Sequence, residues 1–159
     1  MKEVMTMEIK MFYLENDRDS ARVMFIPYPE RGTTQIAVHY PDGKFMTPIK
    51  CTGATCEYCK AHDNPFPRYK YFFALYDEDE KCVKFWERAQ LGTNLLVSAL
   101  VNYEDIEHQV FEVTRLGCKG DPATRYVLTP LYKSEAPDIN RDELPTASEL
   151  FDHRYITKV

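Results

Sequence analysis

The stretch "RYKYFFALYDEDEKCVKFWER", residues 68–88, decides the fold that the sequence predicts. Its first part, 68–76, is rich in aromatic residues and is typical of a β-strand. The acidic run "DEDE" at 77–80 predicts a turn, and 81–88 predicts a second strand that returns beside the first. We therefore expect a β-hairpin at the centre of the molecule.

The rest of the chain also alternates short strands with turns. One segment differs, "TNLLVSALVNY" at 93–103, where Leu96, Ala99, Leu100 and Tyr103 have the spacing of one helix face. Short strands with one helix before the last strand pair predict a mostly β fold, an OB-like antiparallel barrel. The further strands are expected at 21–28, 33–40, 44–51, 109–117 and 125–132.

The pattern also predicts a domain organisation. Residues 1–132 would form the barrel domain. Residues 133–159 read as a polar, mildly acidic C-terminal tail, with six acids against four Lys and Arg and a short helix near "ASELF".

The composition of the chain indicates its cellular compartment and limits the kinds of binding partner that we expect. No apolar run of the 159 residues is long enough to span a bilayer, and charged residues interrupt the first segment, so neither a membrane span nor a signal peptide is expected. A cytoplasmic protein with reduced thiols fits the odd count of five cysteines. The net charge of −5 gives no hint of a polyanionic partner, but the acids and bases are segregated along the chain, so their placement matters more.

Three of the cysteines, Cys51, Cys56 and Cys59, form a C-x4-C-x2-C pattern. A C-x2-C pair lets two thiolates reach one tetrahedral ion from a single turn, which predicts one structural Zn²⁺. A redox pair at Cys56 and Cys59 is the alternative, but no thioredoxin-like context surrounds it. Glu57 lies between two ligands without an H-x-E signature, so we expect no catalytic zinc and no enzyme.

The fourth ligand would be a histidine, and two are available, His39 and His62. If 33–50 formed a straight hairpin about Asp42 and Gly43, Cys51 would lie opposite Thr34, roughly 16 Å from His39 at ~3.3 Å per residue. A bulge or an early end to the pairing would be needed. His62 follows Cys59 by three residues, and this short connection restricts how both could reach one tetrahedral ion. The residues alone leave both open.

Aromatic and basic residues alternate in the central hairpin. Lys84, Trp86 and Arg88 share one strand face, and because burying unpaired charge is costly, we expect this face to point outward. Rings that stack on bases and cations that follow phosphates are what single-stranded nucleic acid requires. The candidate contacts are Arg68, Tyr69, Tyr71, Lys84, Trp86, Arg88, Arg115, Lys119, Arg125 and Tyr126.

In the order of its parts, the chain over 22–132 resembles the single-stranded-DNA-binding proteins of tailed phages and, more remotely, the helix-destabilising protein of T-even phages. The specific parts are "AVHYPDG" before "CTGATCEYCKAHDNP", and the ending "TRLGCKGDPATRYVLTPL". The resemblance implies an OB fold with a small zinc-binding insertion at 39–66, whose ligands are His39, Cys51, Cys56 and Cys59. It also implies single-stranded DNA across the barrel, a place in phage replication or recombination in the cytoplasm of an infected bacterium, and replication or recombination proteins as partners of an acidic tail.

We therefore expect a non-enzymatic protein that coats single-stranded DNA without reading its sequence. The alternative is a zinc-stabilised adaptor whose aromatic face binds another protein. A zinc-dependent hydrolase or nuclease is a third hypothesis, but the sequence offers no clustered carboxylate pair for it.

Overall fold

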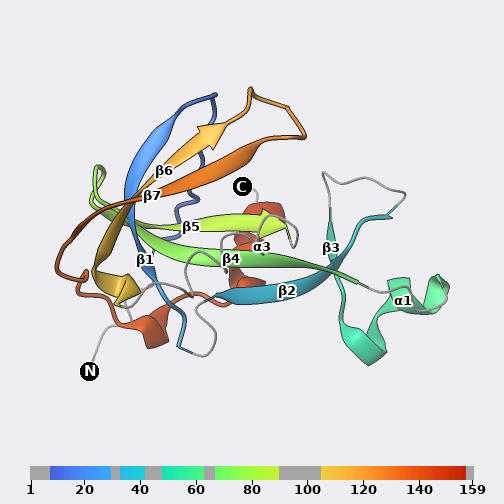
Figure 1. Cartoon of the computed structure of the whole chain (residues 1–159). Helices are drawn as coiled ribbons and strands as arrows, with labels where there is room; N and C mark the ends of the chain where they lie inside the picture. The colour runs from blue at the N-terminus through green and yellow to red at the C-terminus, as the bar shows by residue number, and fades with distance from the viewer. Residues whose placement is uncertain (1–7, 30–32, 42–47, 63–66, 90–104, 157–159) are drawn as a thin grey trace.

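The computed structural model describes residues 8–29, 33–41, 48–62, 67–89 and 105–156. The prediction of a mostly β protein is confirmed, with a seven-stranded antiparallel sheet and two short helices in these ranges (Figure 1). The helix expected at 93–103 and the start of the strand expected at 44–51 lie outside the described residues. The strands are β1 Ser20–Ile26, β2 Thr34–His39, β3 Ile49–Lys50, β4 Arg68–Asp77, β5 Cys82–Ala89, β6 Gln109–Leu116 and β7 Arg125–Lys133, and the helices are α1 Glu57–Ala61 and α3 Ala147–Tyr155.

The long strand β4 organises the sheet. β5 pairs with it along one side, while β2 pairs with its first half and β1 with its second half on the other side. β1 continues to β6, and β6 to β7. In the described part of the chain β5 and β7 do not pair, so the sheet curls without closing, and "barrel" is only an approximate description.

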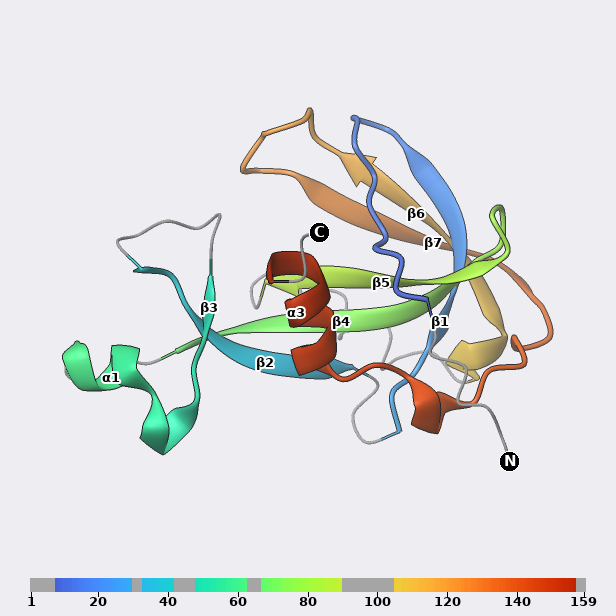
Figure 2. The ribbon, with the colours of Figure 1, turned by 180° about the vertical axis from the view of Figure 1, so that it is seen from behind.

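The two faces of β4 and β5 bury different cores because side chains alternate along a strand. One face packs Phe73, Leu75 and Trp86 against side chains of β1 and β6 and of the segment before β1. The other face packs Phe72, Ala74 and Phe85 against α3 and the turn before it. Figure 2 shows α3 lying across β4 and β5 on this second face.

The segment after β7 is part of this second core over its described residues. Thr146 caps α3 through a capping box with Glu149, and Leu150 is fully buried against the sheet. The Tyr28 hydroxyl donates to the Pro145 carbonyl at 2.8 Å. The expected short helix is therefore present, and apolar residues among the polar ones pack it onto the sheet.

Candidate functional site

A compact cluster lies where β2 and β3 end, and it consists of His39, Cys51, Cys56 and Cys59. One ligand atom from each lies within 4.8 Å of all the others. The Sγ of Cys59 is 3.3 Å from Nε2 of His39 and 3.7 Å from Sγ of Cys51. His39 and the two sulfurs of α1 are buried. Three thiols and one imidazole at these separations can surround a single tetrahedral metal ion, without an open position for a substrate.

The register of the β2–β3 pair brings His39 and Cys51 together. Val38 pairs with Lys50 and His39 with Ile49, and the Cys51 N–H donates to the Ala37 carbonyl at 3.0 Å. The expected pairing of Cys51 with Thr34 is therefore wrong. The connection from β2 to β3 spans 40–48, which is longer than a two-residue turn, and this shifts the register by three residues towards His39.

The short elements after β3 supply the other two sulfurs. Gly53, with a φ of +70°, begins a 3₁₀ turn at Gly53–Thr55 that leads directly into α1. Cys56 is the N-cap of α1 and Cys59 lies one turn later, so both thiols point to the same side. The spacing C-x2-C thus works here through the first turn of a helix.

His62 does not join the cluster. Its Nδ1 donates to the Tyr58 carbonyl at 3.0 Å, and its ring is exposed. The Tyr58 ring stacks on His62 on one side, with ring centroids 4.0 Å apart, and on His39 on the other at 4.5 Å. The structure thus favours His39 over His62 as the histidine of the cluster.

The pKa values of the Cys56 and Cys59 thiols shift in opposite directions. Backbone hydrogen bonds lower the pKa of Cys56, the largest contribution coming from Cys59. Burial raises the pKa of Cys59, and the neighbouring sulfurs of Cys56 and Cys51 raise it further. Thiolates this close repel one another, and a bound cation removes that repulsion.

Trp86 is not on an outward plate, contrary to the expectation. It is 3% exposed and packs edge-on against Phe12, at a centroid distance of 5.2 Å, and against Tyr126 at 4.9 Å. Lys84, on the same face, forms ion pairs with Asp77 and Glu80 and so avoids the cost of an unpaired charge. This part of the face is covered by neighbouring strands, which the strand pattern alone does not predict.

Further along β4 and β5 the same face becomes accessible. Tyr71 pairs with Arg88 across the strands, so their side chains share a face, and both are half-buried. The Arg88 guanidinium lies 4.6 Å from the Tyr126 ring and 5.4 Å from the Trp86 ring, a cation–π arrangement. Burial lowers the pKa of Arg88 from its usual range. Tyr69 is two residues from Tyr71 and on the same face.

The remaining candidate cations have different surroundings. Arg115 is 5% exposed and donates to the carbonyl oxygens of Leu14, Gly117 and Cys118, so it supports the loop structure. Lys119 is exposed and pairs with Glu15 at 2.8 Å. Arg68 and Arg125 are exposed at the ends of β4 and β7. The structure therefore gathers Tyr71, Arg88 and Tyr126, with Tyr69 on the same face, and separates Arg115 from this group. Arg68 lies on the opposite face of β4, over the Tyr40 ring.

Two contributions near this face were missed from the sequence. Residues 11–13 lie beside β5, and Arg154 reaches Glu87 from α3, with Nε 3.7 Å from Oε2. The alternation of buried Phe12 and Leu14 with exposed Tyr13 is a strand-like signal that could have indicated the first. No local pattern indicates the second.

Comparison with protein-family models, curated proteins and solved structures found no match to the chain. Neither of the described helices is long and apolar enough to cross a membrane.

Proposed function

We propose that the protein binds single-stranded DNA without sequence specificity and that one structural Zn²⁺ supports the binding surface. The group Tyr69, Tyr71, Arg88 and Tyr126 carries this proposal. Aromatic rings and a guanidinium share one accessible face of β4, β5 and β7, where bases could stack and phosphates could approach. We call this group the aromatic face.

The cluster of three cysteines and one histidine supports the zinc part of the proposal. Zn²⁺ is borderline-soft and prefers closed tetrahedral sites of sulfur and nitrogen when its role is structural. His39 is two residues from Ala37, which pairs with Tyr69, so His39 and the aromatic face lie on the same side of the sheet. The ion would fix the end of β2, β3 and α1 beside the aromatic face and so preform the surface.

The surface suits a flexible strand better than a duplex. Stacking on tyrosine rings needs unpaired bases, which a single strand presents and a duplex does not. The half-buried guanidinium of Arg88 would approach a phosphate, while base identity would matter little. Because the order of motifs resembles that of phage proteins, a role in DNA replication or recombination is part of this proposal.

Replacing Tyr71 by Ala should weaken binding of a fluorescein-labelled dT oligonucleotide by about 1–3 kcal/mol, since one stacked base is lost. The measurement is fluorescence anisotropy at low salt. Tyr132→Ala is the matched control, because Tyr132 is a 48% exposed strand tyrosine that lies outside the aromatic face. Equal affinities for the two variants would contradict the assignment of the surface.

A protein-binding adaptor is the second candidate. It is favoured by the edge strand β7, which has only one partner among the described strands. On this strand Val127, Leu131 and Tyr132 are exposed large hydrophobic residues. This candidate predicts binding to a protein partner that Tyr132→Ala abolishes, and no salt-dependent affinity for oligonucleotides.

A further inference from the structure

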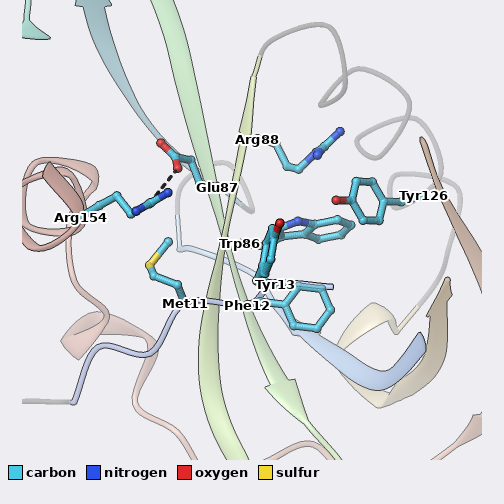
Figure 3. A pocket seen from close by; sticks show the side chains of 8 residues that line it. All are labelled: Met11, Phe12, Tyr13, Trp86, Glu87, Arg88, Tyr126 and Arg154. Carbon is cyan, nitrogen blue, oxygen red and sulfur yellow. Dashed lines mark ion pairs between the residues drawn. The ribbon is translucent and has the colours of Figure 1, made fainter. Parts of the chain in front are cut away.

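A pocket of about 480 Å³ lies beside the exposed edge of β5 (Figure 3). The segment before β1, the end of α3 and Tyr126 of β7 form its other walls. Figure 3 places Arg154 and Glu87 at one end and Arg88 and Tyr126 at the other, with the side chains of residues 11–13 and Trp86 between them.

The pocket exists because the segment before β1 separates from β5. The Phe12 N–H donates to the Phe85 carbonyl at 2.7 Å, and the Phe85 N–H donates to the Lys10 carbonyl at 2.8 Å. The chain then turns towards β6, where the Leu14 carbonyl accepts from Arg115 at 2.7 Å. Beyond Phe85 the two segments diverge, and the pocket occupies the wedge between them.

This divergence leaves a backbone donor and acceptor of β5 facing the wedge. Phe85 directs its N–H and C=O away from β4, and residues two apart on a strand direct these groups to the same side, so Glu87 does the same. Within the described ranges, no backbone hydrogen bond from outside the sheet reaches either group of Glu87. The wall of the pocket therefore presents one N–H and one C=O side by side.

The other walls are aromatic and cationic. Tyr13 is 62% exposed and lines the pocket together with Trp86 and Tyr126, whose rings meet edge-on at 4.9 Å. The Nε of Arg88 is buried and has no hydrogen-bond partner among the residues that the structure describes. At the other end the Arg154 side chain is half-exposed, so it can turn towards an anion.

We propose that this pocket holds one nucleotide of the bound single strand. The base lies among the rings of Tyr13, Trp86 and Tyr126, and its hydrogen-bonding edge meets the N–H and C=O of Glu87. The phosphate lies at Arg154. This inference rests on the proposed function, and it adds a base-binding pocket to the aromatic face.

The backbone N–H and C=O of Glu87 can form hydrogen bonds with any of the four bases. Each base has neighbouring donor and acceptor atoms on its Watson–Crick edge, so a backbone N–H and C=O pair can hold all four without selecting one. The volume is within the range of small-ligand sites. An added peptide strand fits less well, because strand addition uses the open edge of several residues, and among the described residues that line the pocket Glu87 alone presents such an edge.

Methionine-methyl NMR on the full chain tests the pocket directly. Met11 lines the pocket, whereas Met24 is buried in β1 and serves as the internal reference. Met11→Leu assigns the signal. We expect a (dT)12 oligonucleotide to shift the Met11 methyl signal and to leave the Met24 signal in place, and dTMP alone to produce the same change weakly.

Arg154→Gln provides the matching affinity test, with Arg18→Gln as the control, since Arg18 is exposed and does not line the pocket. Loss of one phosphate contact should reduce the slope of log K against log salt by about 0.7 in Arg154→Gln only.

Binding of (dT)12 without a Met11 shift, and with equal slopes in both variants, overturns the pocket but leaves the proposed function intact. If (dT)12 does not bind, the proposed function falls, and dTMP then decides the pocket. A Met11 shift with dTMP supports it as a nucleotide site, and no shift removes it.

Discussion

Trp86 lies where one face of the sheet changes from core to surface. On one side of it along β4 and β5, Phe73 and Leu75 are fully enclosed, and on the other side Tyr71 and Arg88 are only half-buried. A single strand face can therefore contain both core residues and the accessible residues that we propose bind DNA. At the residue scale, function depends on which neighbours cover each position.

Trp86→Ala should destabilise the protein by about 3–5 kcal/mol, because it removes a large buried ring and leaves a cavity. Tyr71→Ala should cost much less, since Tyr71 is half-exposed. Urea unfolding followed by circular dichroism measures both. A Trp86→Ala variant as stable as the wild type would mean that the ring is not part of the core.

At the scale of elements, the cluster of one histidine and three cysteines depends on the pairing of β2 with β3. The register places Cys51 opposite Ala37, two residues from His39, and α1 then supplies two more sulfurs. Few apolar residues stabilise this end of the sheet, because β3 has only two residues and α1 only five. A bound ion would therefore be the main link between these elements.

Cys59→Ser should remove the zinc and lower the melting temperature by about 5 °C or more, because the loop, β3 and α1 lose their common link. Cys118→Ser is the control, since Cys118 is exposed and distant in sequence from the cluster. Metal analysis and thermal unfolding provide the readouts. One zinc per chain in Cys59→Ser, at wild-type stability, would show that the cluster is not the site.

The elements show what sequence patterns can and cannot predict. The period-two alternation predicts the strands, and the spacing of Cys51, Cys56 and Cys59 predicts the cluster, because both depend on near neighbours in the chain. The hairpin register depends on the long 40–48 connection, and the burial of Trp86 depends on strands that fold over it. Arg154 meets Glu87 across 67 positions of sequence, so no local pattern connects them.

At the scale of the whole molecule, the two faces of β4 and β5 are covered by different parts of the chain. One face is covered by α3, which Lys50 holds through Ser148 and Asp152 and which Tyr155 holds through Glu87. The aromatic face lies on the opposite side of the sheet, as does His39 of the cluster with Cys51, Cys56 and Cys59. The covered face makes the sheet rigid, and this rigidity would keep the rings and guanidinium in place for a flexible strand.

The salt dependence of oligonucleotide binding tests the central claim most directly. For a fluorescein-labelled (dT)12 strand, two phosphate contacts, at Arg88 and Arg154, predict a slope of log K against log salt of about −1.4. A duplex of the same length should bind more weakly, because its bases cannot stack on the protein. No binding at low salt, or binding that salt does not change, would contradict single-stranded DNA binding.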